Sequence, residues 1–280
     1  MYQVAGHESN DVLSIGGTDI HYLDVGSGPA LLLVHGLGHS VVSWHRNIEA
    51  LRRTQRVIAL DLPGYGLSAC PGDAPYDPPY FASIIRQFVC ALGLQTVDAV
   101  GCSAGGLSIL LAALDAPELF RRLVLVDPVG FTAVPNHMGG DVLLGLFGVW
   151  QGLPANRSLI RAWYASAFYD PAAADEETVT DLHRRRHHRA SIRAARKAWA
   201  AFFNYSRDLA PLHERLKSLA PPVLVVWGKN DRMFPVKDSA VAKRVLPRSR
   251  IEWLDRCGHC PQLERPDEFN ALVLEFLNAS

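Results

Sequence analysis

A serine between two glycines, at the point where an apolar strand turns into a helix, constrains this chain more than any other feature. The serine is Ser103, with Gly101 two residues before it and Gly105 two residues after it. The mostly apolar residues 96–100 predict a short buried strand, and the apolar run 107–114 has the length of a helix. Glycines at these positions remove the Cβ atoms that would block so sharp a turn, which leaves the serine hydroxyl exposed. The motif predicts a nucleophilic serine that faces the N–H groups of the following helix.

The composition excludes several other classes of protein. Of the 280 residues, 49% are hydrophobic, which is enough for a substantial core. Basic and acidic residues number 28 each, so no overall charge attracts nucleic acid or an anionic membrane. Residues 1–10 lack the pattern of a signal peptide, and the apolar stretch 142–150 is too short to span a bilayer. We therefore expect a cytoplasmic protein without membrane insertion, a monomer or homodimer, whose partner is a small molecule.

The five cysteines are an odd number and have no disulfide-framework spacing. Cys257 and Cys260 match C-x-x-C, but neither a second pair nor a suitably spaced histidine completes a zinc site. We expect these thiols to be small fillers beside His259. The sequence therefore predicts no metal and no cofactor.

Predicted strands and helices alternate along most of the chain. After a hairpin over residues 12–25, strands are expected at 30–34, 56–60, 123–126, 223–227 and 250–254, and helices at 41–51, 80–92 and 267–277. This alternation predicts an α/β fold with a mostly parallel, doubly wound sheet. Residues 131–208 carry helical patterns alone, so we expect them to be an insertion in a core domain of residues 1–130 and 209–280.

Two further residues stand directly after predicted strands. Asp231 follows strand 223–227, and His259 follows strand 250–254. Because the carboxyl ends of parallel strands meet at one edge of a sheet, we expect both side chains to lie near Ser103. A serine nucleophile needs a base, and the base needs an orienting acid. His259 would accept the hydroxyl proton, and Asp231 would fix the tautomer of its ring.

Five segments, in this order, resemble the landmarks of α/β-hydrolase-fold enzymes. They are residues 34–38 (VHGLG), 61–68 (DLPGYGLS), 101–106 (GCSAGG), 228–235 (GKNDRMFP) and 257–266 (CGHCPQLERP). The resemblance covers nearly the whole chain except residues 131–208, and it implies an α/β-hydrolase fold in which those residues form a helical cap, or lid. It identifies Ser103, Asp231 and His259 as a catalytic triad. It also assigns the oxyanion hole to the backbone N–H groups of Leu37 and Ala104.

Other polar residues near these landmarks compete for the same roles. Asp127 also ends a strand and is the alternative acid, but it lacks the Gly-x-x-Asp-Arg context of Asp231. His35 and Asp61 resemble family residues that mainly hold loops. The basic run 183–189 is expected to be the solvated face of a cap helix, with one inward-facing arginine as the alternative, which would hold a substrate carboxylate.

The predicted cap has more apolar side chains than a solvated surface needs, so part of it is expected to line an acyl pocket. The candidate pocket residues are Trp44, at the predicted floor, and Phe147, Trp150, Trp163 and Tyr164 in the cap.

The resemblance implies a serine hydrolase that needs no cofactor and works through an acyl-enzyme. The default substrate is a carboxylic ester with a small to medium, apolar or aromatic acyl group. The alternative is a hydrolase of carbon–carbon bonds in meta-cleavage products, because residues 168–170 and 266–270 look like those enzymes. Against it, Cys260 stands where they have tryptophan, Ser43 stands where they have asparagine, and their cap arginine has no unambiguous counterpart. A perhydrolase, an acyltransferase and a catalytically silent binding protein are less favoured alternatives.

Overall fold

An eight-stranded sheet organises the computed structural model, which describes residues 2–4, 7–9, 11–133 and 156–279. The strand order is β10-β9-β8-β7-β5-β6-β4-β3. The strands are β3 (Asp11–Ile15), β4 (Thr18–Gly26), β5 (Ala30–Val34), β6 (Arg56–Leu60), β7 (Val97–Cys102), β8 (Phe120–Val126), β9 (Val223–Gly228) and β10 (Arg250–Leu254). Only β4 pairs antiparallel, with β3 and β6. The predicted mostly parallel α/β sheet is therefore confirmed. A separate antiparallel pair, β1 (Tyr2–Val4) and β2 (His7–Ser9), was not predicted.

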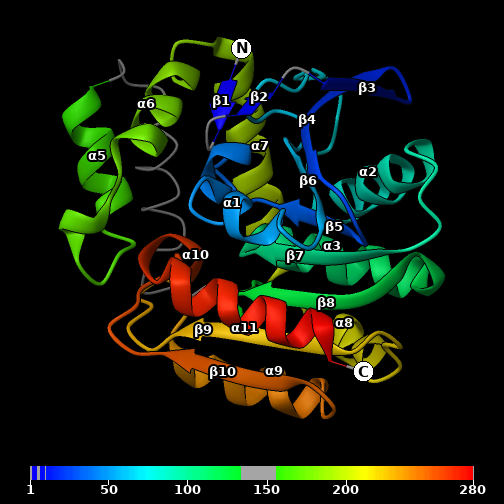
Figure 1. Cartoon of the computed structure of the whole chain (residues 1–280). Coiled ribbons are helices and arrows are strands. Elements are labelled where there is room, and N and C mark those ends of the chain that lie inside the picture. The colour runs from blue at the N-terminus through cyan, green and yellow to red at the C-terminus, as the bar shows by residue number, and fades with distance from the viewer. Residues whose placement is uncertain (1, 5–6, 10, 134–155, 280) are drawn as a thin grey trace.

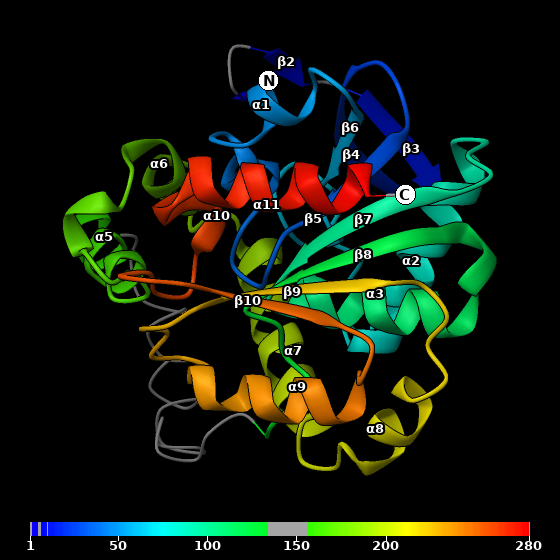
Figure 2. The same ribbon diagram turned by 60° about the horizontal axis from the view of Figure 1, so that its bottom comes forward.

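Helices cover both faces of the sheet, which explains why strands such as β5 and β9 are continuous apolar runs. On one face lie α1 (Ile48–Leu51) and α11 (Pro266–Asn278) (Figure 2). On the other face lie α2 (Pro78–Ala91), α3 (Ala104–Asp115), α8 (Ala210–Leu216) and α9 (Ser239–Val245) (Figure 2). The two faces bury separate apolar clusters, so the sheet is a rigid platform whose strand ends hold the loops that follow them.

The described part of the predicted insertion is helical. Helices α5 (Arg157–Ala165) and α6 (Glu176–Arg185) lie beyond the carboxyl ends of β8, β9 and β10 (Figure 1). They bury a third apolar cluster, to which Cys260 and Leu263 of the core also contribute. Helix α7 (Arg189–Tyr205) packs instead against α2, where the Phe81 and Phe202 rings lie 5.9 Å apart. The limits of a cap domain at 131 and 208 stay a prediction.

The predicted helix over residues 41–51 is wrong as a single element. The structure has a 3-10 helix, η1 (Val41–Trp44), followed by the short α1. Between them the buried Asn47 side chain donates hydrogen bonds of 2.9 Å to the Gln262 carbonyl and to Asn270 Oδ1. These partners lie in α10 (Pro261–Glu264) and α11, so long-range contacts fix the bend.

A helix needs about 20 mostly apolar residues to span a lipid bilayer. Across the described ranges, none is both long and apolar enough to cross a membrane.

Candidate active site

Ser103 lies at the sharp turn between β7 and α3. Its backbone has φ of 52° and ψ of −116°, a left-handed φ that non-glycine residues rarely adopt, and its N–H donates 2.8 Å to the Val126 carbonyl of β8. A Cβ atom on Gly105 would lie 2.4 Å from the Val34 carbonyl oxygen, so this turn has no room for a larger residue. The strain and the close packing together fix the serine at the end of β7.

The loop after β5 passes directly beside this serine. A Cβ atom on Gly36 would lie 3.1 Å from the Ser103 Cβ atom. The buried His35 ring holds the loop, because Nδ1–H donates 2.8 Å to the Gly36 carbonyl and Nε2 accepts from Leu62 N–H at 3.0 Å. Burial lowers the pKa of His35 to about 4, so the ring is neutral, as both hydrogen bonds require. His35 therefore has the loop-holding role expected from the sequence.

Two backbone N–H groups near Ser103 were predicted to form an oxyanion hole. They belong to Ala104, the first residue of α3, and to Leu37, in the loop that passes Ser103. Within the described residues, neither N–H donates to a backbone carbonyl. Both groups are therefore available to an oxygen that develops negative charge.

The structure brings Asp231 and His259 together. His259 Nδ1 lies 2.7 Å from Asp231 Oδ2, and both residues are buried. The other oxygen of Asp231 accepts the Met233 and Phe234 N–H groups at 2.7 and 3.0 Å. Three donors thus hold the Asp231 carboxylate in one orientation, and it in turn orients the His259 ring.

Ser103 and His259 are both described, and no hydrogen bond joins them in this structure. Their loops nevertheless open at the same edge of the sheet, because β7, β8, β9 and β10 are successive parallel neighbours. Bonds between a nucleophile and its base are often long or poorly aligned without substrate.

A second carboxyl group, Asp127 at the end of β8, lies beside this pair. One oxygen of Asp127, one oxygen of Asp231 and one ring nitrogen of His259 all lie within 4.8 Å of one another. Burial first, and then the charge of Asp231, raises the pKa of Asp127 well above its ordinary value. Among the described residues this is the trio of side chains close enough to share a metal ion. Asp231 and His259 of this trio already share a hydrogen bond. We therefore interpret the three side chains as a proton-binding group and not as a set of metal ligands.

Asp61 has the loop-holding role expected from the sequence. It is fully buried, and its oxygens accept hydrogen bonds from Val41 N–H at 2.8 Å, Leu67 N–H at 2.9 Å and His21 Nδ1 at 2.7 Å. It therefore ties β4, η1 and the loop after β6 into one unit below the site.

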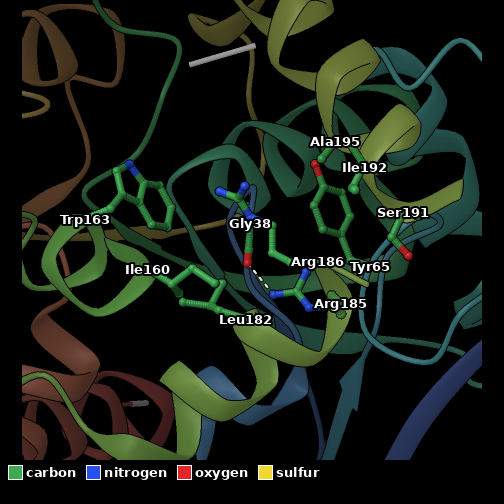
Figure 3. Close-up of a pocket in the computed structure, with 11 residues that line it drawn as sticks. Gly38, Tyr65, Ile160, Trp163, Leu182, Arg185, Arg186, Ser191, Ile192 and Ala195 are labelled. Atoms are coloured by element: carbon green, nitrogen blue, oxygen red, sulfur yellow. Dashed lines mark hydrogen bonds between the residues drawn. The ribbon is translucent and has the colours of Figure 1, made fainter. Parts of the chain in front are cut away.

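Helix α6 contributes a charged wall to a pocket beside the Leu37 loop. The pocket is lined by Gly38, Gly64, Tyr65, Ile160, Trp163, Leu182, Arg185, Arg186, Ser191, Ile192 and Ala195. Arg185 donates a hydrogen bond to the Gly38 carbonyl, with Ile160 and Trp163 on one side and Tyr65 on the other (Figure 3). Arg185 also pairs with Asp181 at 3.2 Å, and Asp181 accepts from the Ser40 hydroxyl at 2.7 Å.

These contacts correct the sequence interpretation of the basic run at Arg185, while residues 187–189 are exposed as expected. Arg185 is only 9% exposed, so it is not on the solvated face of a helix. Arg186 also lines the pocket, and burial together with Arg185 lowers its pKa to about 10, which leaves it charged at neutral pH. The inward-facing arginine that the sequence left as an alternative is therefore present. Sequence reasoning had one usable signal for it, the four-residue spacing between Asp181 and Arg185 on a helix.

The predicted pocket residues divide into three groups. Trp163 lines the pocket beside Arg185, whose lining residues include none of the predicted triad, so its contact with substrate stays a prediction. Tyr164 does not line this pocket, because its buried ring packs on Phe168 and its hydroxyl donates 2.9 Å to Asp175. Trp44 is fully buried in the cluster between the sheet and α11, so it forms no part of this pocket floor. Phe147 and Trp150 lie outside the described residues.

The cysteines near the site are free thiols packed in the interior. Cys102, Cys257 and Cys260 are buried, and burial raises the pKa of each thiol. Cys102 Sγ lies 3.6 Å from Gln262 Nε2. The thiols are therefore neutral fillers around Ser103 and His259, as the sequence indicated.

Comparison with known proteins gives a consistent family. The model of the alpha/beta hydrolase fold family matches residues 29–266. The chain is 30% identical over 273 residues to 2-hydroxy-6-oxo-2,4-heptadienoate hydrolase of Pseudomonas putida F1, covering 94% of each chain. It resembles the structure of 2-hydroxy-6-oxo-6-phenylhexa-2,4-dienoate hydrolase from Rhodococcus sp. strain RHA1, with a TM-score of 0.84, 27% identity and coverage of 97% and 99%. It also resembles a membrane phospholipase A described as a bacterial virulence factor, with a TM-score of 0.83, 28% identity and coverage of 98% and 88%.

Proposed function

Because this chain belongs to the α/β-hydrolase fold family and is a hydrolase, we propose that it cleaves carbon–carbon bonds in vinylogous diketone acids, the products of meta-cleavage of aromatic rings. The observation that carries the proposal is the pair Arg185 and Arg186, which line a pocket beside the loop of Leu37. A cationic wall at this place suits a substrate that carries a carboxylate at the other end of its conjugated chain from the bond to be broken. The similarity to dienoate hydrolases over nearly the whole chain supports the same substrate class.

In the proposed reaction Ser103 is the nucleophile. His259 accepts the proton of the Ser103 hydroxyl, and Asp231 holds the ring and stabilises the imidazolium. The oxygen of the attacked ketone gains negative charge between the N–H groups of Leu37 and Ala104. The structural support is the 2.7 Å contact between His259 and Asp231 and the passage of the Gly36 loop beside Ser103.

The leaving group is a carbon, which distinguishes this reaction from ester cleavage. The electron pair of the broken C–C bond must enter the conjugated keto acid, and the carbon takes up a proton. Water then hydrolyses the acyl-enzyme, so that overall its hydroxyl joins the acyl carbon and its hydrogen joins the leaving carbon. We assign Arg186 to the carboxylate of the keto acid, because it lines the pocket and stays charged at neutral pH.

Carboxylic ester hydrolysis, which is the default expectation from the sequence, is the second candidate function. It is favoured by the similarity to a phospholipase A and by Cys260, which stands where the carbon–carbon hydrolases have tryptophan. Both candidates share the same nucleophile, so labelling of Ser103 does not separate them.

The test measures kcat/KM on two substrate series with one enzyme preparation. The first is a set of vinylogous diketone acids, whose loss of absorbance reports cleavage. The second is a set of p-nitrophenyl esters of increasing chain length. The proposal requires the best diketone acid to exceed the best ester, and an ester preference would establish the second candidate instead.

A further inference from the structure

A buried carboxyl group beside the candidate triad has half of its hydrogen-bonding capacity unused. Asp127 is completely buried, and its Oδ1 accepts the Gly228 N–H at 3.0 Å. Its Oδ2 has no donor within hydrogen-bonding distance in the described chain. A buried carboxylate oxygen without a hydrogen-bond donor is strongly unfavourable, so the environment of this oxygen needs an explanation.

The group that this oxygen meets is a second carboxyl group. One oxygen of Asp127 lies within 4.8 Å of one oxygen of Asp231, and Asp231 already has three donors, the Met233 and Phe234 N–H groups and the His259 ring. Two carboxylates this close cannot both be ionised. Since Asp231 has three donors and Asp127 has one, the proton belongs on Asp127.

We propose that Asp127 is a positioning residue, whose protonated carboxyl group donates its Oδ2–H to the Asp231 carboxylate so that a single negative charge faces His259. The inference rests on the proposed roles of Asp231 and His259, but it does not depend on the substrate class. In this role Asp127 acts on the base through Asp231.

Titratable groups from several neighbouring elements face Asp127. The groups that face Asp127 are Asp231, His259, Glu264 of α10 and the thiols of Cys102, Cys257 and Cys260. Burial raises the pKa of all three thiols, so they carry no charge. Glu264 is anchored by the Gly258 and Tyr169 N–H groups at 2.8 and 2.7 Å. Apart from the His259 ring, none of these neighbours can carry a positive charge that would stabilise an ionised Asp127.

The proton on Asp127 matters for the base. His259 must be neutral to accept the Ser103 proton, and a second negative charge beside it would favour the imidazolium. One carboxylate is enough to fix the tautomer of the His259 ring. The neutral Asp127 therefore supplies orientation to Asp231 without adding charge.

The test follows the pH dependence of the second-order rate at which a fluorophosphonate acylates Ser103. Asparagine keeps a donor toward Asp231 and an acceptor for Gly228, so Asp127→Asn should retain the acid limb of the wild-type profile. Asp127→Ala removes the donor, and its acid limb should move to higher pH with a slower maximal rate. Asp238→Asn, which changes a buried aspartate bonded to Thr132, is the matched control and should leave the limb in place.

The opposite outcomes are distinct. If Asp127 is ionised in the wild type, Asp127→Asn removes a negative charge, and the acid limb of the rate profile should move to lower pH by about 1–3 units. That shift to lower pH would overturn the inference. Identical pH profiles for the wild type, Asp127→Asn and Asp127→Ala would overturn it as well.

A second readout does not depend on labelling. The wild type should show the infrared carbonyl stretch of a buried carboxylic acid, shifted in heavy water, and Asp127→Asn should lose it. This also keeps the inference testable if the alanine variant does not fold. Failure of the fluorophosphonate to label the active wild type would count against the proposed nucleophile, whereas an absent carboxylic acid band would count against Asp127 alone.

Discussion

The backbone N–H of His259 donates a hydrogen bond of 2.8 Å to the carbonyl of Ala167, just after α5. The loop that carries the candidate base is therefore held by a segment of the predicted cap as well as by Asp231. On the opposite side, Arg185 of α6 holds the Gly38 carbonyl in the loop that carries Leu37. Helices α5 and α6 thus contact the candidate base loop and the candidate oxyanion loop directly. We infer that substitutions in these helices alter the chemical step as well as substrate choice.

Ser103 is predicted to be the nucleophile. Treatment with a fluorophosphonate should add one label, and peptide mapping should place it on Ser103. His259→Ala should abolish labelling, because an unassisted hydroxyl is a poor nucleophile at neutral pH. A label on another residue, or an active preparation that takes up none, would contradict the assignment.

Asp231 is predicted to be the orienting acid. Asp231→Asn should fold normally and lower kcat by about 10³–10⁴, because the neutral amide favours the wrong tautomer of His259. Asp127→Asn should lower kcat far less, since Asp127 has no hydrogen bond to the ring. Steady-state kinetics of the two variants decide the point, and exchanged results would make Asp127 the acid.

Much of the fold could be predicted from local sequence, because strands of a parallel sheet that is covered on both faces are continuous apolar runs. Strands such as 30–34 and 223–227 are apolar at every position, and the structure places both inside the sheet. Residues 41–51 also look like one amphipathic helix. Their bend depends on Asn47 and Asn270, which are 223 positions apart in the chain, so no local pattern contains it.

The candidate site was predictable to the extent that it follows strand ends. Ser103, Asp231 and His259 each stand just after a predicted strand, and parallel topology directs such residues to one edge. The burial of Arg185 was not predictable, because an arginine in a basic run looks solvated until α6 is placed against the Gly38 loop. The contact between Asp127 and Asp231 likewise depends on β8 and β9 being neighbours.

Arg186 is predicted to bind the substrate carboxylate. Arg186→Gln should lower kcat/KM for a diketone acid by about 10–100-fold, the range expected for a lost charge-assisted hydrogen bond. Its kcat/KM for a neutral p-nitrophenyl ester should be unchanged. Arg184→Gln is the matched control, because the Arg184 side chain is 42% exposed and pairs with Asp181. Equal losses on both substrates would show that Arg186 supports the fold instead.

His35 makes the stability of the protein sensitive to acid. Its pKa is about 4 in the folded protein against an ordinary value of 6.5, so the unfolded chain binds one more proton between these pH values. The stabilising effect is present above pH 6.5 and is lost as the pH falls toward 4, by about 1.4 kcal/mol per pH unit. Chemical denaturation at several pH values across this range should show that the free energy of unfolding changes less steeply with pH in His35→Gln than in the wild type. His188 is exposed, so His188→Gln should keep the wild-type pH dependence of the free energy of unfolding. The same unchanged pH dependence in His35→Gln would refute the prediction.

Gly258 tests whether contact with α5 is needed to place His259. A Cβ atom at this position would lie 2.3 Å from the Ala167 carbonyl oxygen and 2.8 Å from the Tyr169 nitrogen. Both are backbone atoms, so Gly258→Ala must push the loop away from the end of α5, at a cost of about 1–3 kcal/mol in stability. The displaced His259 should also lower the rate of Ser103 labelling. Gly72→Ala is the control, because a Cβ atom there meets nothing within 4 Å. If Gly258→Ala is destabilised but labels at the wild-type rate, Asp231 alone positions the histidine, and the cap contact serves stability only.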